Sequence, residues 1–154
     1  MKTVVLENVR SAHNVGSIFR TADAAGVGKI YLVGYTPSPV DRFGRVQPEI
    51  RKTSLGASDV IPWEHREDVV SLLEDLREQG LEVVAVEQTP TAKPLPQFAV
   101  PQNVAYVFGN EIEGVSDEAL GCCNAVVEIP MLGSKESLNV SVATGVVLYH
   151  GFDT

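Results

Sequence analysis

The sequence predicts an α/β fold, with a parallel sheet covered by helices on both faces. Short apolar segments typical of strands alternate with segments of helical periodicity, which is the pattern of β-α-β units. The strand segments are apolar at successive positions, so both faces of the sheet are expected to be buried. A length of 154 residues fits one domain, and we expect residues 1–154 to form it.

The first half of the chain contains a predicted β-α-β unit. Its strands are residues 3–7 and 29–33, and its helix is residues 14–25, with Asn14 as the N-cap. A helical crossover brings the two strands into parallel pairing. The segments that follow are predicted to be a loop (34–44), a short helix (48–55) and an extended joint (61–63).

The second half begins with an amphipathic helix over 66–79, which a glycine at position 80 ends. The segment 89–101 contains four prolines and is predicted to be a loop. Ser116 is predicted to cap a short helix. The remaining predicted elements are the strands 82–86, 104–108 and 125–129 and the closing helix 139–149.

Charge is distributed unevenly along the chain. The formal net charge of −8 opposes non-specific binding to a polyanion. Between residues 37 and 52, however, four cationic side chains stand against two acidic ones. This local basic stretch on an acidic body can contact a phosphate, but it cannot hold a long nucleic acid by charge alone.

Targeting and redox features predict a cytoplasmic protein. No apolar run approaches the length of a transmembrane helix, and the N-terminus is typical of a strand rather than a signal peptide. Cys122 and Cys123 are adjacent, which is the wrong spacing for an ordinary structural disulfide or a zinc site. We therefore expect a reduced, partly buried pair at a helix end and no membrane partner.

Several common catalytic motifs are missing. No Gly-x-Gly-x-x-Gly follows the first strand, no Walker lysine motif or Gly-x-Ser-x-Gly elbow occurs, and no cluster has metal-ligand spacing. Polar, glycine-containing loops instead follow the strands 104–108 and 125–129, and a polar loop with His13 follows the first strand. Because ligands lie beyond the carboxyl ends of parallel strands, these loops predict the site. His13 either faces this site or is an exposed loop histidine.

Three motifs resemble those of a known family. They are Asn14-x5-Arg20, Phe108-Gly-Asn-Glu-Ile-Glu-Gly114, and Ile129-Pro-Met-x5-Ser-Leu-Asn-Val-Ser-Val-Ala143. Together they resemble the SpoU (TrmH-like) RNA ribose 2′-O-methyltransferases of the SPOUT superfamily, and the segment 52–57 also resembles a recurrent segment of that family. The resemblance covers nearly the whole chain, in order.

The resemblance implies a parallel-sheet α/β knot, with a C-terminal trefoil knot whose loops bind S-adenosyl-L-methionine in a bent shape. It implies methyl transfer to a ribose 2′-hydroxyl in tRNA or rRNA, by a homodimer whose RNA site spans both protomers. No RNA-binding extension is expected beside this catalytic domain, so substrate choice rests on its own loops or on a separate RNA-recruiting protein. The alternatives are a partner-dependent subunit and a non-catalytic RNA-binding module on the same fold.

The resemblance also assigns cofactor contacts. Gly109, Ile129 and Leu138 are expected to meet the cofactor, and at Gly109 the missing side chain allows close approach. Met131 and Ser137 are second choices, and the loop after residue 86, around Glu87 and Gln88, is a third. The small and branched residues of the closing helix predict burial, either at a dimer face or within the knot.

Catalytic roles follow from the same motifs. By this resemblance, Arg20 is the residue that removes the proton of the ribose hydroxyl. A guanidinium, however, has a pKa above ~12 and is therefore already protonated. Either the site depresses that pKa strongly, or Arg20 binds an RNA phosphate. Glu111 is expected to orient Arg20 through charge-assisted hydrogen bonds, and Ser137 and Asn139 are expected to fix its geometry and line the pocket. Asn14 is expected to hydrogen-bond the nucleotide or the neighbouring loop.

Basic side chains in loops are candidate RNA contacts because they can neutralise phosphates. On charge and position they are Arg10, Arg42, Arg45, Arg51 and Lys52. We expect no metal site.

Overall fold

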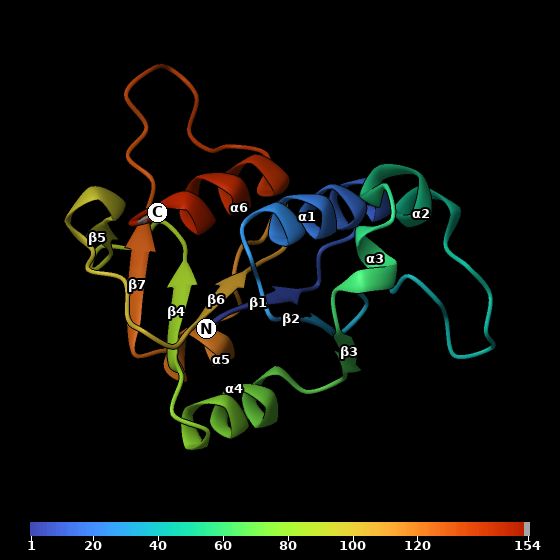
Figure 1. Cartoon of the computed structure of the whole chain (residues 1–154). Helices are drawn as coiled ribbons and strands as arrows, with labels where there is room; N and C mark the ends of the chain where they lie inside the picture. The colour runs from blue at the N-terminus through green and yellow to red at the C-terminus, as the bar shows by residue number, and fades with distance from the viewer. Residues whose placement is uncertain (153–154) are drawn as a thin grey trace.

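The computed structural model describes residues 1–152 and contains a seven-stranded sheet in the order β3-β2-β1-β6-β4-β7-β5 (Figure 1). Every strand pairing in it is parallel, as the sequence predicts. The strands are β1 (Lys2–Glu7), β2 (Lys29–Val33), β3 (Trp63–Arg66), β4 (Glu82–Val86), β5 (Lys93–Pro94), β6 (Val104–Phe108) and β7 (Ala125–Glu128).

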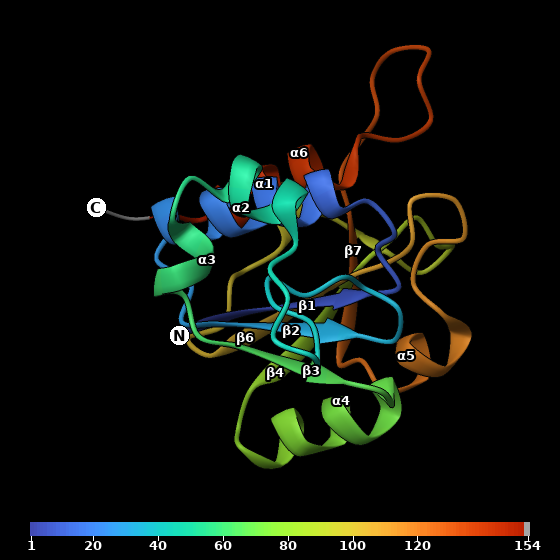
Figure 2. The same cartoon turned by 90° about the vertical axis from the view of Figure 1, so that its right-hand side faces the viewer.

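Helices cover both faces of the sheet (Figure 2). Helices α1, α2, α3 and α6 form a layer on one face, and α4 and α5 lie on the other. This three-layer arrangement confirms the predicted fold class. The helices are α1 (Ala12–Ala24), α2 (Pro48–Ser54), α3 (Ala57–Val60), α4 (Val69–Glu78), α5 (Asp117–Gly121) and α6 (Val140–Tyr149), with a 3-10 turn η1 (Leu95–Gln97).

The central strand β6 shows why the strand segments are continuously apolar. Tyr106 and Phe108 belong to the core beneath α1 and α6, whereas Ala105 and Val107 belong to the core above α4. Successive residues of a strand point to opposite faces, so both faces require apolar side chains. All of these side chains are buried.

Helix α1 begins earlier than predicted. Its N-cap is Ser11, whose hydroxyl oxygen accepts a hydrogen bond from the backbone N–H of Asn14 at 3.1 Å. The prediction of Asn14 as the N-cap is therefore wrong. Ser11 is an equally strong capping residue, and it starts the helix three positions sooner.

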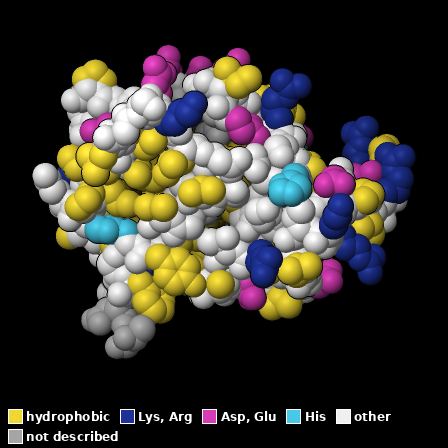
Figure 3. Space-filling view, turned by 90° about the horizontal axis from the view of Figure 1, so that it is seen from above, with side chains coloured by type: hydrophobic (Ala, Val, Ile, Leu, Met, Phe, Trp, Pro, Cys, Tyr) yellow, Lys and Arg dark blue, Asp and Glu magenta, His cyan; other side chains and the backbone are white. Residues whose placement is uncertain are grey.

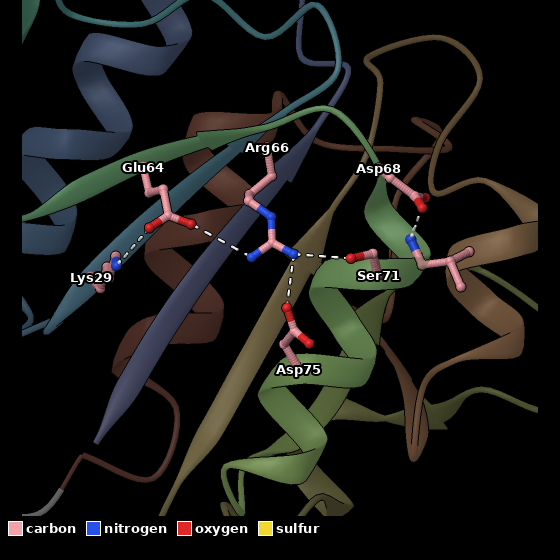
Figure 4. Close-up of polar contacts among 7 residues, drawn as sticks. Lys29, Glu64, Arg66, Asp68, Ser71 and Asp75 are labelled. Atoms are coloured by element: carbon pink, nitrogen blue, oxygen red, sulfur yellow. Dashed lines mark hydrogen bonds and ion pairs between the residues drawn. The ribbon is translucent and has the colours of Figure 1, made fainter.

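The region 61–79 also differs from its prediction. Residues 63–66 form β3, which pairs with β2 at the edge of the sheet, and α4 begins only at Val69, capped by Asp68. Arg66 belongs to the strand rather than to the helix. Its guanidinium reaches Asp75 at 2.8 Å and Glu64 at 3.5 Å (Figure 4), so an ion-pair network ties the edge strand to α4.

The proline-rich segment 89–101 is more ordered than the predicted loop. It contains β5 and η1. Pro94 is tolerated in β5 because this strand lies at the edge of the sheet, where a missing N–H breaks no ladder.

The last strand does not lie at an edge of the sheet. β7 lies between β4 and β5, although both precede it in the chain. The C-terminal part therefore enters the sheet late, a path compatible with a C-terminal knot. Knots are rare exceptions to ordinary topology, and the trefoil knot itself stays a prediction.

Candidate functional site

A cavity of about 430 Å³ lies beyond the carboxyl ends of β4, β6 and β7. Three loops enclose it, one after each of these strands, together with the start of α6. This is where polar loops in a parallel sheet are expected to form a ligand site. The lining residues are Val86, Glu87, Gln88, Phe108, Gly109, Asn110, Glu111, Ile112, Glu113, Gly114, Glu128, Ile129, Met131, Ser137, Leu138, Asn139, Val140 and Ala143.

All the residues predicted to contact a cofactor line this cavity, and three of the predicted catalytic residues line it too. The former are Gly109, Ile129, Leu138, Met131, Ser137, Glu87 and Gln88, and the latter are Glu111, Ser137 and Asn139. Residues from positions 86 to 143 thus converge on one volume.

The glycines of the loop 109–114 are required by close packing within the protein itself. A β-carbon at Gly109 would overlap the backbone of Gly114 and Val115. Gly114 has a φ of +74° and lies against the Glu87 carboxylate. Gly109 therefore has a structural reason to be glycine, in addition to its predicted place beside a ligand.

Asn110 organises this loop, and the sequence reasoning missed its role. Its side-chain oxygen accepts hydrogen bonds from the N–H groups of Ile112 at 2.8 Å and Glu113 at 2.9 Å. Its amide nitrogen donates to the Asn8 carbonyl and the Tyr35 hydroxyl, both at 2.9 Å. The sequence feature that could have indicated this role is an Asn at the start of a tight turn.

Glu87 and Gln88 brace two of the cavity loops. The Glu87 carboxylate accepts hydrogen bonds from the N–H groups of Val115 and Gln88, each at 2.9 Å. The Gln88 side chain donates to the Glu136 carbonyl at 2.6 Å. The short segment after β4 therefore connects the loop after β6 to the loop after β7. Nothing in the sequence alone indicates these contacts.

Glu111 lies at the N-terminus of α1. Its carboxylate accepts hydrogen bonds from the N–H groups of Arg10 and Ser11, each at 3.0 Å. Burial raises the pKa of Glu111, but these N–H groups and the Asn14 amide stabilise the charged form more, so the pKa lies below 4.5.

The predicted contact between Glu111 and Arg20 is wrong within one chain. Ser11 to Arg20 spans nine helical positions, or about 13 Å along the axis of α1. Arg20 is exposed, and within residues 1–152 no hydrogen bond or ion pair involves its guanidinium. Ser137 and Asn139 line the cavity instead of contacting Arg20, and Asn139 caps α6 by accepting from the Ser141 N–H at 2.9 Å.

The predicted RNA contacts lie outside the cavity. Arg42 and Arg45 are exposed on the segment before α2, and Arg51 and Lys52 are exposed on its last turn. The exposed Arg10 side chain lies beside the cavity loop, because its own N–H holds Glu111. His13 is likewise exposed.

The cavity is acidic. Among the lining residues in the described part of the chain, the ionisable side chains are the carboxylic acids of Glu87, Glu111, Glu113 and Glu128. No group of three or more potential ligands is placed to hold a metal ion within residues 1–152. A site with such a lining favours a cationic ligand and disfavours one that carries phosphates.

A parallel α/β domain with three convergent loops at its carboxyl edge defines a ligand-binding domain of the α/β class. The model of the SpoU rRNA Methylase family matches residues 1–149. The chain therefore belongs to the SpoU family, as the motifs predict.

Curated relatives align with nearly all of this chain. A 23S rRNA (guanosine-2′-O-)-methyltransferase RlmB from Xanthomonas axonopodis is 37% identical over 146 residues, which are 95% of this chain and 56% of the relative. A tRNA (guanosine(18)-2′-O)-methyltransferase from Thermus thermophilus is 37% identical over 147 residues, 96% of this chain and 72% of the relative. The chain spans about half the length of the first of these.

Solved structures show the same fold. The AdoMet-bound rRNA methyltransferase from Sinorhizobium meliloti has a TM-score of 0.82 and 30% identity, over 97% of this chain and 54% of the other. The TrmH/SpoU tRNA modifying enzyme of A. aeolicus has a TM-score of 0.84 and 29% identity, over 97% and 72%.

The position of Glu111 predicts a pH-dependent stability. Because its folded pKa is depressed, its contribution is complete above pH 4.5 and is lost as pH falls through the folded pKa. Glu111→Gln should lower the free energy of unfolding by about 0.5–1 kcal/mol at neutral pH. In urea unfolding from pH 7 down to pH 3, the difference from wild type should shrink below pH 4.5. Glu113→Gln is the matched control, and a difference that stays constant across this range contradicts the assignment.

The brace made by Glu87 predicts local stabilisation of the loop after β6. Glu87→Ala should lower the free energy of unfolding by about 1 kcal/mol and speed amide exchange at Val115. Hydrogen exchange followed by mass spectrometry measures this, with Glu113→Ala as a control that removes a cavity carboxylate outside the brace. Equal protection in both variants would show that Glu87 does not hold the loop.

Proposed function

We propose that this chain is an S-adenosyl-L-methionine-dependent methyltransferase that acts on a ribose 2′-hydroxyl in tRNA or rRNA. One observation carries the proposal: the cavity collects the residues of two SpoU motifs, Phe108 to Gly114 and Ile129 to Ala143, into a single volume. Membership of the SpoU family and 37% identity to named 2′-O-methyltransferases support it.

The cavity suits this cofactor in size and charge. A volume of about 430 Å³ lies within the range of small-molecule sites. The cofactor supplies an electrophilic methyl group on a sulfonium, and the carboxylates of Glu87 and Glu128 favour such a cation. Ile129 and Leu138 provide apolar contact, and the AdoMet-bound relatives support this choice.

The loops perform the positioning that methyl transfer needs. Orientation of the reacting groups and exclusion of water account for much of the rate of such a reaction. Glu111 fixes one cavity loop on α1, and Gln88 fixes another through the Glu136 carbonyl. The cavity is therefore braced by the protein rather than shaped by its ligand alone.

We infer that the protein works as a homodimer through the outer face of α6. Val142, Val146 and Tyr149 follow the spacing of one helix face and are 51%, 42% and 45% exposed. Figure 3 looks down on this layer, and hydrophobic side chains gather at the end opposite the basic loop. Such patches on a soluble domain usually mark an interface.

A dimer also gives Arg20 a site of action. Arg20 lies on α1, which packs beside α6 where Thr21 meets Gly145. Since Arg20 cannot reach Glu111 of its own chain, we propose that it serves the cavity of a second protomer. There it contacts either the reacting hydroxyl or the adjoining phosphate.

The compartment and domain organisation follow from this function. No helix within residues 1–152 is long and apolar enough to cross a membrane. We propose action on RNA in the cytoplasm, by residues 1–154 as a single catalytic domain.

Methyl-labelled S-adenosylmethionine tests the activity, with separated tRNA and rRNA that lack native modification as substrates. Label should enter one RNA fraction. The RNA backbone should resist alkaline cleavage at the modified position. Arg20→Ala should lower the rate at least about 100-fold, and Arg77→Ala, an exposed helix arginine on the opposite face, should leave it unchanged.

The negative outcomes are also informative. Cofactor binding without transfer, restored by cell extract, would indicate a subunit that needs a separate RNA-recruiting protein. Absence of cofactor binding would leave a non-catalytic RNA-binding module on the same fold.

The dimer face predicts a change of oligomeric state. Val146→Glu should convert a dimer to a monomer, because a buried unpaired charge at an interface costs several kcal/mol, on the order of 2–5. Light scattering after size-exclusion chromatography measures the mass. Val60→Glu is the matched control, since Val60 is 71% exposed on α3. An unchanged mass for Val146→Glu would place the interface elsewhere.

A further inference from the structure

A small, internally bonded turn projects from the segment between β2 and α2. An antiparallel bridge between Val40 and Val46 closes it. One carboxylate oxygen of Asp41 accepts hydrogen bonds from the N–H groups of Phe43 and Arg45, each at 2.9 Å. The other accepts from the Arg45 Nε at 2.8 Å. Gly44, with a φ of +78°, completes the turn.

The turn presents an exposed aromatic side chain with two guanidinium groups over its ring. Phe43 is 67% exposed. The guanidinium carbons of Arg42 and Arg45 lie 4.9 Å and 5.0 Å from its ring centroid. Both distances are within the range of a cation–π interaction. The Asp41 salt bridge uses the Nε of Arg45, and within the described residues no hydrogen bond involves the terminal nitrogens of either arginine.

We propose that an unpaired RNA base stacks on Phe43 in place of a guanidinium group, and that Arg42 and Arg45 then contact the phosphates beside it. The inference rests on the proposed RNA substrate and names which RNA element this loop recognises. An aromatic ring stacks on the face of any base, and arginines beside it track the backbone. Because a paired base shows only its edges, the loop selects a single-stranded or looped segment.

The charge of the molecule favours this partner. The whole chain carries −8, yet this turn and the following helix carry four cations against two acids. Figure 3 shows Lys and Arg side chains gathered at the projecting end. A local cationic cluster on an otherwise acidic protein binds a polyanion at that one place. Such a cluster favours a polyanion over an apolar protein surface as its partner.

The location defines which nucleotides are contacted. Figure 1 shows the segment before α2 projecting beyond that helix, on the side away from α6 and the loop 130–138. The cavity is formed by loops at the other end of this layer. Relative to the cavity of the same protomer, the stacked base is therefore a nucleotide other than the methylated one, and it contributes affinity and register rather than chemistry.

Binding of a labelled RNA, measured by fluorescence anisotropy at about 150 mM salt, tests the proposal. The probes are one single-stranded oligonucleotide, the same sequence in a duplex, and polyglutamate. Phe43→Ala and Phe43→Leu should each raise the Kd for the single strand about tenfold, while Phe43→Tyr keeps it within about twofold. Binding to the duplex should be insensitive to all three changes.

A second measurement reports stacking directly. Trp63 is the only tryptophan of the chain, so Phe43→Trp combined with Trp63→Phe leaves one indole in the turn. Its fluorescence should be quenched on adding the single strand and unchanged on adding the duplex. This readout does not depend on methyl transfer. Circular dichroism melting confirms that each variant is folded.

The outcomes separate this inference from the proposed function. Equal single-strand binding by wild type, Phe43→Ala and Phe43→Leu overturns the stacking role, even if RNA is methylated. Phe43→Leu binding like wild type, or a Phe43-dependent affinity for polyglutamate, also overturns it, in favour of an apolar or acidic protein partner. If wild type binds cofactor but neither binds nor methylates RNA, the proposed function fails, and the stacking role fails with it.

Discussion

The parallel pairing of β1 with β6 is the constraint on which the site depends. It joins residues about one hundred positions apart, with Leu6 opposite Phe108. This register places the loop after β6 beside the chain that leaves β1, so Asn110 reaches the Asn8 carbonyl and Glu111 reaches the start of α1. Because side chains alternate with a period of two, a shift by one residue would move the side chains of one strand to the opposite faces of the sheet.

Carboxylates and amides at the carboxyl edge of the sheet hold the loops in place through hydrogen bonds. Glu7 is almost fully buried and accepts hydrogen bonds from the N–H and hydroxyl of Ser116, the cap of α5. Glu87 and Glu111 bind backbone N–H groups in the same way on the neighbouring loops. Backbone donors at helix starts and turns favour anions. An acidic protein can therefore build a rigid site from its own acids.

The same acids separate two tasks in space. The cavity is lined by carboxylates, whereas the exposed cations of the turn before α2 lie at the far end of the α1 layer. A cationic cofactor and an anionic RNA favour opposite potentials. The cavity and the proposed stacking turn therefore suit groups of opposite charge.

Local patterns determined the elements of this protein, and tertiary contacts determined how they meet. Continuous apolar runs predicted β1, β2, β4, β6 and β7, and the motif loops predicted the lining of the cavity. The short edge strands β3 and β5 were not predictable, because their partners in the sheet make them strands. The same holds for the brace by Glu87 and for the separation of Arg20 from Glu111. Sequence spacing encodes the faces of one helix or strand, whereas the distance between side chains far apart in the chain is set only by packing.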